Sequence, residues 1–249
     1  MLFMNLKIII NCGPCQDYIG LCLASVRAQS VQDWEAFVTI DPCGDDTAER
    51  AFAARAGDGR VDIRVNPERR YAMDNLIHGI GRSGAGADDV IVILDGDDWF
   101  ATERALERIV AEYEQRDCWM TYGSWATNDP SRKGASAGCW PAYPDGTQNF
   151  RETPWLGTAV RSWRKWLFDL IDDSDFRDQD GNYLLVAEDR ATMLPMLEMS
   201  GTDRARHIPD VLMIYNRLTP HACGKVHLDL MRKTAADVCS RPAYHRLDR

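Results

Sequence analysis

The 249-residue sequence has no apolar run long enough to cross a membrane, and it contains no repeat and no low-complexity segment. A membrane-spanning helix needs about 20 mostly apolar residues. The apolar N-terminal stretch 1–10 is short, is interrupted by Lys7 and is not followed by a small-residue cleavage site. We therefore expect a first β-strand here rather than a signal peptide, no membrane span, and a cytoplasmic location.

Positive charge is also in short supply, because 29 Lys and Arg residues face 38 Asp and Glu residues, for a formal net charge of −9. No dense basic stripe is present. Proteins that bind nucleic acid draw much of their affinity from basic side chains on phosphates. The charge therefore argues against a nucleic-acid partner without excluding one, while an apolar fraction of 45% is ordinary for a globular protein.

Strand and helix patterns alternate through the first hundred residues, which predicts βαβ units and a parallel sheet. The expected strands there are 7–10, 34–40, 61–65 and 90–94, and the expected helices are 17–28, 46–56 and 71–80. Beyond them we expect strands at 118–122 and 211–215, a long loop at 123–151, and helices at 102–115, 162–171, 188–199 and 225–238. Thr102 would cap the first of these helices, and Pro195 would kink or interrupt the third.

An acidic run follows the most apolar of these strands. Asp95, Gly96, Asp97 and Asp98 come directly after Val90–Leu94. Parallel sheets bind ligands at the carboxyl ends of their strands, and Mg²⁺ and Mn²⁺ prefer carboxylate and phosphate oxygens. Gly96 would let backbone or ligand approach closely. The run therefore predicts a metal and phosphate site, although a solvated acidic turn is the simpler alternative.

The chain resembles the family-2 glycosyltransferases of the GT-A type. The metal motif is Asp95–Asp98, Asp41 stands where the family has an aspartate facing the nucleotide base, and Asp46-Thr47 ends that loop. The opening of the family is matched by Ile8-Ile9-Ile10, Tyr18-Ile19, Cys22-Leu23, Ser25-Val26, Gln29-Ser30 and Trp34-Glu35. The resemblance covers 6–125 and, more loosely, 155–216. Residues 164–168 and 193–199 are also similar to glycosyltransferases of large viruses and phages.

This resemblance implies an α/β, Rossmann-like GT-A fold with a mostly parallel central sheet flanked by helices. Residues 1–125 would form the nucleotide-sugar half and 126–249 the acceptor half of one continuous domain. The donor would be a nucleotide-diphosphate sugar, usually a UDP-sugar, bound with Mn²⁺ or Mg²⁺. Asp97 would be the main metal ligand, with Asp95 on metal or ribose and Asp98 in support. The residues expected to contact the donor are Asn11, Gly13, Asp41, Arg69, Arg70, Asn75, Asp95 and Gly96.

A second acidic pair, Glu188-Asp189, opens a predicted helix. In the resembled family an aspartate at this place is the base of an inverting displacement, so we assign that role to Asp189, with Glu188 as the alternative. Acids at a helix start are common without any catalytic role. His221, rather than His227, is the candidate for a third metal ligand.

The eight cysteines allow two competing hypotheses, although without a secretory signal most should be reduced. Cys12-Gly13-Pro14-Cys15 spells a thioredoxin-like redox motif between a strand and a helix, a context that lowers a thiol pKa. The tryptophan that normally precedes such a motif is Asn11 here. A zinc site from Cys12, Cys15, Cys22 and Cys43 lacks a second spaced pair. Neither hypothesis explains the acidic run at Asp95–Asp98.

The acceptor is left open by the sequence. Trp140 and Trp155 are candidates for stacking on an acceptor, and the basic residues Arg161, Arg164 and Lys165 could meet a diphosphate or an anionic acceptor. A glycan, a lipid-linked acceptor, a protein, and hydroxymethylpyrimidine in phage DNA all fit. A nucleotidyltransferase of related fold, or a nucleotide binder without catalysis, would share the donor-side features.

Overall fold

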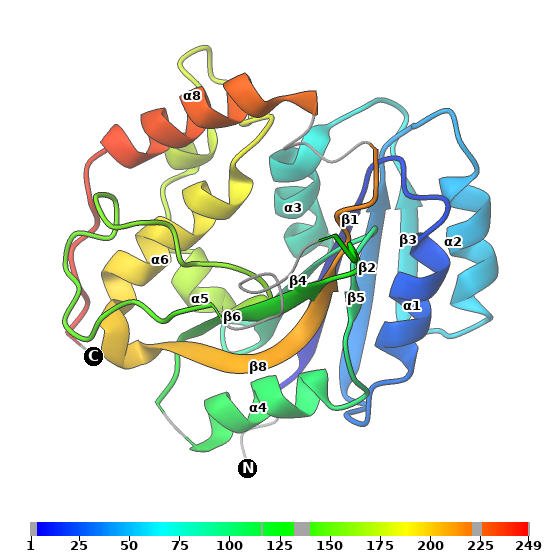
Figure 1. Ribbon diagram of the computed structural model, residues 1–249, viewed down its shortest axis with the longest axis horizontal. Coiled ribbons are helices and arrows are strands. Elements are labelled where there is room, and N and C mark those ends of the chain that lie inside the picture. Colours follow the sequence, from blue (N-terminus) through cyan, green and yellow to red (C-terminus); the bar gives the residue numbers. More distant parts are fainter. Residues whose placement is uncertain (1–3, 116, 132–139, 221–225, 249) are drawn as a thin grey trace.

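The computed structural model describes residues 4–115, 117–131, 140–220 and 226–248 (Figure 1). One eight-stranded sheet in the order β3-β2-β1-β4-β7-β6-β8-β5 runs through it. Its strands are β1 (Leu6–Cys12), β2 (Trp34–Ile40), β3 (Val61–Val65), β4 (Val90–Asp95), β5 (Trp99–Phe100), β6 (Met120–Thr127), β7 (Arg161–Arg164) and β8 (Ala205–Tyr215). Its helices are α1 (Ile19–Arg27), α2 (Thr47–Arg55), α3 (Tyr71–Arg82), α4 (Ala105–Gln115), α5 (Lys165–Phe168), the 3₁₀ helix η2 (Asp173–Phe176), α6 (Glu188–Arg204) and α8 (Leu228–Ser240).

The first four strands pair in parallel, as the sequence predicts, whereas the rest of the sheet is mixed. β7 runs antiparallel to both β4 and β6, and β5 runs antiparallel to β8. The expected α/β fold is confirmed, with a sheet less uniformly parallel than its N-terminal half suggested.

Helices cover both faces of the sheet because the central strands are apolar on both sides. In β1, Ile8 and Ile10 enter a core shared with α1, α2 and α4, while Ile9 enters a second core shared with α3, α5 and α6. Figure 1 shows α1 and α2 on the opposite side of the sheet from α6 and α8. This two-sided burial leaves the ends of the strands as the place where polar groups can gather.

The expected helix at 162–171 is wrong. Residues 161–164 form β7, and only Lys165–Phe168 are helical before a turn. Ser162 is fully buried, and its hydroxyl bonds those of Tyr113 (2.9 Å) and Thr121 (2.6 Å). The apolar spacing of Trp163, Trp166 and Leu167 is compatible both with a helix and with a strand followed by a turn. Pairing with the neighbouring strands of the sheet makes 161–164 a strand.

Several element boundaries also differ from expectation, and β8 begins at Ala205 rather than at residue 211. β6 continues to Thr127, so the following loop begins later than residue 123. α6 continues through Pro195, and its non-helical residue is Gly201 (φ 63°, ψ 175°). All residues from Ala191 to Gly201 are buried, so packing on every side holds the helix despite the amide hydrogen bond that proline cannot make.

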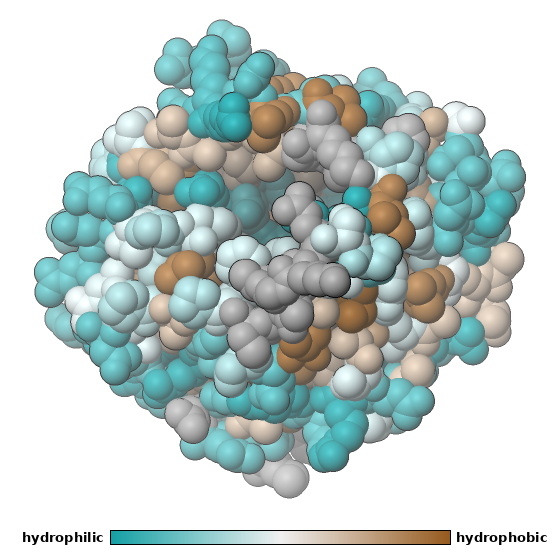
Figure 2. Space-filling model, viewed as in Figure 1, coloured by the Kyte–Doolittle hydropathy of each residue, from teal (hydrophilic) through white to brown (hydrophobic). Residues whose placement is uncertain are grey.

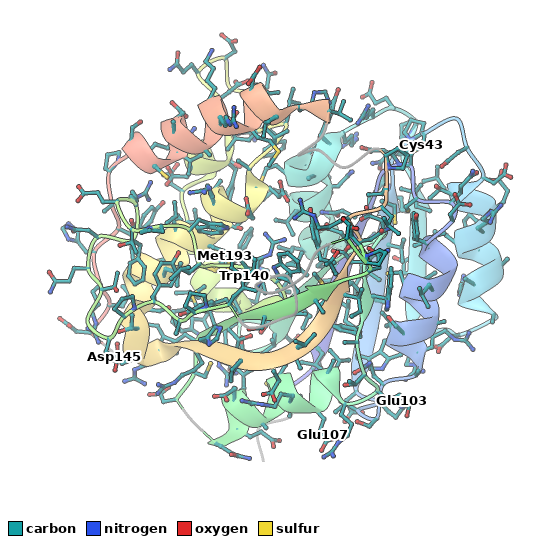
Figure 3. The ribbon with its side chains drawn as sticks, in the orientation of Figure 1. Cys43, Glu103, Glu107, Trp140, Asp145 and Met193 are labelled. Carbon is teal, nitrogen blue, oxygen red and sulfur yellow. The ribbon has the colours of Figure 1, made fainter. Side chains whose placement is uncertain are left out.

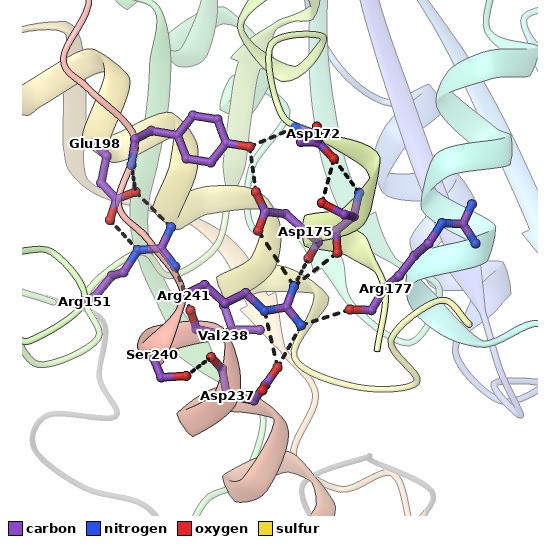
Figure 4. Close-up of polar contacts among 11 residues, drawn as sticks. Arg151, Asp172, Asp175, Arg177, Glu198, Asp237, Val238, Ser240 and Arg241 are labelled. Carbon is purple, nitrogen blue, oxygen red and sulfur yellow. Dashed lines mark hydrogen bonds and ion pairs between the residues drawn. The ribbon is translucent and has the colours of Figure 1, made fainter. Parts of the chain in front are cut away.

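A polar network fixes the C-terminal segment against α6 and η2 (Figure 4). The buried Arg151 guanidinium donates to both carboxylate oxygens of Glu198 (2.6 and 2.9 Å) and to the Val238 carbonyl (2.6 Å). Tyr244 donates its hydroxyl to Asp175 (2.6 Å), and Arg241 donates to the Asp175 carbonyl (2.6 Å). These contacts hold α8 in place beside the cleft described below.

No helix in the described part of the chain has the length and apolarity needed to cross a bilayer.

Candidate active site

A cleft of about 410 Å³ opens at the carboxyl ends of β1, β2 and β4. The hollow is visible on the face drawn in Figure 2. Its polar lining includes Asn11, Asp41, Arg69, Asn75, Asp95, Asp97, Asp98, Arg161, Glu188 and Asp189. Both acidic groups predicted from the sequence therefore lie on one cleft, although they are more than 90 residues apart in the chain.

Asp41 forms the wall of the cleft next to α3. Its carboxylate accepts hydrogen bonds from the backbone amides of Arg70 (3.0 Å) and Tyr71 (2.9 Å), where α3 begins. Asn66 donates to Asp41 (2.9 Å) and to the side-chain oxygen of Asn75 (2.7 Å). Asp41 thus fixes the start of α3 and places Asn75 in the cleft. The sequence gave no reason to single out Asn66 as the link.

The acidic loop after β4 contributes three carboxylates with different surroundings. Asp98 is 1% exposed, and its oxygen accepts from the backbone amide of Asn216 (2.8 Å), which ties the loop to the end of β8. Burial, followed by the charge of Asp95, raises the pKa of Asp97 to about 7. Asp98 therefore anchors the loop, while Asp97 and Asp95 line the cleft and repel each other.

The acidic loop fits a divalent cation that also binds a phosphate ligand. No group of three or more His, Cys, Asp or Glu side chains in the described ranges is arranged to hold a metal by itself. Asp95 and Asp97 instead supply hard oxygen ligands from one side, and a cation there would offset the burial and the neighbouring negative charges that raise their pKa values. Such a site leaves coordination positions for oxygens that a substrate brings.

Glu188 and Asp189 line the cleft from the first turn of α6. Burial, followed by the charge of Asp189, raises the pKa of Glu188 to about 7, and Arg161 opposes this shift. One oxygen of Asp189 accepts from the backbone amide of Arg190 (2.8 Å). The pair therefore presents acid and base chemistry to the same space as the metal motif.

The raised pKa of Glu188 predicts a pH dependence of stability. Because the folded-state pKa lies above the ordinary value of 4.5, the folded protein holds this proton more tightly than the unfolded chain. Its contribution to stability is complete below about pH 4.5 and is lost as the pH rises to about 7. We expect Glu188→Gln to raise the melting temperature at pH 8 by roughly 2–8 °C and to leave it nearly unchanged at pH 4. Thermal unfolding of both proteins across this range, without metal, checks the sign, and an equal shift at both pH values would contradict it.

Buried thiols lie directly beneath the acidic loop. Cys12, Cys15 and Cys22 are buried and free, and Cys22 donates to the Asp95 carbonyl (3.7 Å). The hydrogen bond with Cys15 and burial raise the pKa of Cys12 well above its usual value. The expected lowering of a thiol pKa is therefore wrong here, and the thioredoxin-like hypothesis loses its chemical basis because reactive thiols need a low pKa. The zinc hypothesis finds no ligand group among the described residues.

Gly96 has a packing role. A Cβ at this position would lie 2.4 Å from Cys12 Sγ and 3.2 Å from Cys15 Sγ, and the glycine does not line the cleft. We expect Gly96→Ala to lower the free energy of unfolding by roughly 1–3 kcal/mol, as overpacking does, and Cys12→Ala in the same chain to restore much of the loss. Urea unfolding of the single and double variants measures this coupling. Simple additivity of the two substitutions would contradict it.

The remaining sequence candidates fall in different places. Gly13 and Trp155 line the cleft, and the Arg190 guanidinium lies 4.9 Å from the Trp155 ring. Arg70 points away, toward Asp74 (3.6 Å) and a small separate pocket. Trp140 stacks near Trp125, with ring centroids 5.1 Å apart, rather than lining the cleft (Figure 3). His221 lies outside the described residues.

Arg161 is the cleft residue that the sequence did not single out. It appeared there only as one of three basic residues around 161–165, with Arg164 and Lys165. Arg164 instead donates to the Asp88 carbonyl (3.0 Å), and Lys165 pairs with Asp169, both away from the cleft. Only the pairing of β7 with β4, which a sequence pattern does not reveal, brings Arg161 to the acidic groups.

Solved structures share this fold. S. aureus TarS 1–349 in complex with UDP-GlcNAc is 13% identical, with a TM-score of 0.64 over 88% of this chain and 60% of that one. The mannosyltransferase PcManGT from Pyrobaculum calidifontis, in complex with GDP-Man and Mn²⁺, is 15% identical, with a TM-score of 0.64 over 97% of this chain and 66% of that one. This chain thus spans about three fifths of that TarS structure.

Sequence comparison identifies the family. None of the curated protein sequences compared matches the chain. The model of glycosyl transferase family 2, however, matches residues 8–172, about two thirds of its length, and includes the first four strands, the acidic loop and β7. Together with the shared GT-A fold, this match confirms the family expected from the sequence. The chain belongs to glycosyl transferase family 2.

Proposed function

We propose that the protein transfers a sugar from a nucleotide-diphosphate sugar to an acceptor hydroxyl, with inversion at the anomeric carbon and with Mn²⁺ or Mg²⁺. One observation carries the proposal: the carboxylates of Asp95 and Asp97 share a cleft with those of Glu188 and Asp189. The nucleotide sugars bound by TarS and PcManGT, and the Mn²⁺ of the latter, support the same donor class and metal.

Different residues along the cleft would bind different parts of the donor. Asp41, Asn75 and Arg69, at the ends of β2 and the start of α3, would bind the nucleotide. Asp97 and Asp95 would hold the cation, with Asn11 and Gly13 in the adjoining turn. The cation, when bound, would neutralise charge on the departing diphosphate. His221 stays a prediction as a further ligand.

Asp189 would act as the base from the opposite side. It would accept the proton of the acceptor hydroxyl while the acceptor oxygen forms a bond to the anomeric carbon. The bond between that carbon and the diphosphate oxygen breaks, and the nucleoside diphosphate leaves with the electron pair. Attack from the face opposite the leaving group inverts the configuration. Glu188, whose pKa is raised to about 7, is the alternative base.

The acceptor is better sought among neutral hydroxyl compounds than among nucleic acids. Six carboxylates and two guanidinium groups line the cleft, so a polyanion would be repelled before any cation binds. A glycan, a lipid-linked acceptor or a protein hydroxyl therefore fits better than the modified DNA suggested by the viral and phage resemblance. Trp155 on the cleft wall could stack against such an acceptor. A cytoplasmic location stays a prediction.

A thermal-shift screen tests the donor class. We expect one nucleotide sugar, supplied with Mn²⁺, to raise the melting temperature by about 5–10 °C at 100 times its dissociation constant. Incubation with that donor should then release the nucleoside diphosphate. Release of pyrophosphate would indicate a nucleotidyltransferase instead, and binding without any turnover across an acceptor panel would indicate a nucleotide binder.

A further inference from the structure

Arg161 occupies an unusual position for a cation. It begins β7 and pairs with Ile93 of β4, two residues before Asp95. The side chain is 9% exposed and lines the cleft. Its buried Nε has no hydrogen-bond partner, and within the described ranges its guanidinium makes no hydrogen bond or ion pair. A guanidinium has five N–H donors, and leaving them unused in a buried place is costly.

The charges around Arg161 explain why a cation is tolerated there. Asp189, Asp95, Glu188 and Asp98 all act on it electrostatically and favour its charged form against the cost of burial. They come from two separate segments of the chain that line the cleft, the acidic loop and the start of α6. Arg161 therefore lies between the metal motif and the base, and its N–H donors remain free to bind a ligand.

The order of the strands indicates which part of a ligand would meet it. From β2 across β1 to β4, the cleft presents Asp41, then Asn11 and Gly13, then the acidic loop. β7 follows β4 on the side away from Asp41. If the nucleotide lies by Asp41 and the diphosphate by Asp97, the next group along the donor is the sugar, and it reaches Arg161.

We propose that Arg161 binds the transferred sugar, donating guanidinium hydrogen bonds to its oxygens, and so determines which nucleotide sugars are accepted. This inference rests on the proposed function. A site built to donate hydrogen bonds to a substrate oxygen discriminates against analogues in which that oxygen is missing or turned away, because its own polar groups are then left unpaired. Arg161 is thus a specificity-determining residue on the floor of the cleft.

The test compares two ligands that differ only in the sugar. A panel of UDP-GlcNAc, UDP-glucose and GDP-mannose with Mn²⁺ identifies the best donor of the unmodified protein. Titration calorimetry then gives the dissociation constants of that donor and of its nucleoside diphosphate for the unmodified protein and for Arg161→Met. We expect Arg161→Met to change the dissociation constant of the nucleoside diphosphate less than about twofold. The same substitution should weaken binding of the nucleotide sugar by roughly 10- to 100-fold.

Arg164→Met is the matched control. Arg164 ends the same strand, but it donates to Asp88 outside the cleft, so the ratio of the two dissociation constants should stay unchanged. Arg161→Lys keeps the charge without the planar fork and provides a second variant if Arg161→Met folds poorly. We expect it to weaken the nucleotide sugar selectively as well.

The outcomes separate the two proposals. Equal weakening of both ligands in the Arg161 variants would place the guanidinium on the diphosphate or in a structural role and overturn the inference. Unchanged binding of both ligands would also overturn it. If the unmodified protein binds no nucleotide sugar, the proposed function itself fails, and this is evident before any variant is made.

Discussion

Asp97→Ala is expected to abolish metal-dependent binding of the nucleotide sugar, weakening it by about 100-fold or more, and to reduce transfer to background. Even supporting residues around a metal typically change affinity 10–100-fold when replaced, and Asp97 is proposed as the main ligand itself. Titration calorimetry with Mn²⁺ present or omitted measures the loss. Asp17→Ala removes an exposed carboxylate that pairs with Arg50 and does not line the cleft, and it serves as the control. Retained Mn²⁺-dependent binding in Asp97→Ala would remove Asp97 from the metal site.

The same substitution should stabilise the protein when no metal is present. Burial, followed by repulsion from the charge of Asp95, raises the pKa of Asp97. Removing that charge relieves the repulsion, so we expect Asp97→Ala to melt at least as high as the unmodified protein in a chelator at pH 8. A gain of about 1 kcal/mol corresponds to roughly 2–4 °C in a chain of this size. Active sites commonly trade stability for function in this way.

Asp189→Asn is expected to lower the turnover of sugar transfer by roughly 10²–10⁴-fold, the usual contribution of a general base. The amide is nearly isosteric and cannot accept the hydroxyl proton. Donor affinity should stay within a few-fold, because Asp189 lies across the cleft from the proposed nucleotide contacts. Steady-state rates with saturating donor, combined with donor titration, separate the two effects.

Glu188→Gln is the comparison for that experiment. It replaces a carboxylate by an amide one residue earlier on α6. If Asp189 is the base, Glu188→Gln should reduce turnover far less than Asp189→Asn. The reverse order would transfer the base role to Glu188. Full turnover in Asp189→Asn would exclude Asp189 as the base.

The N-terminal half of the molecule could be predicted because its pattern is local. The apolar runs Ile8–Ile10 and Val90–Leu94 each mark a buried strand, and the acids that follow them lie where parallel strands end. The predicted positions of Asp41, Asp95 and Asp97 on one cleft therefore agree with the structure. Family resemblance added Glu188 and Asp189, which local pattern alone would not distinguish from ordinary helix-start acids.

The C-terminal half could not be predicted as well, because its structure depends on distant contacts. Ser162 and Trp163 have a spacing compatible with a helix, yet β4 and β6 pair with them as a strand. The cleft position of Arg161 follows from that pairing, so the same error concealed the residue. Trp140 was a candidate for stacking on an acceptor, whereas its ring packs beside Trp125.

The hydrogen bond from the Asn216 amide to Asp98 has a consequence for how the chain acquires function during folding. It joins residues 118 positions apart and clamps the acidic loop to the end of β8. Contacts between residues so far apart in the chain form late, because closing a long loop has an unfavourable entropy that must be overcome before the contact can form. A folding intermediate in which β8 has not yet docked beside β6 would keep its N-terminal strands but leave the acidic loop unclamped. Donor binding during refolding should therefore appear only with the last structural phase, so that the ligand itself reports completion of the native state.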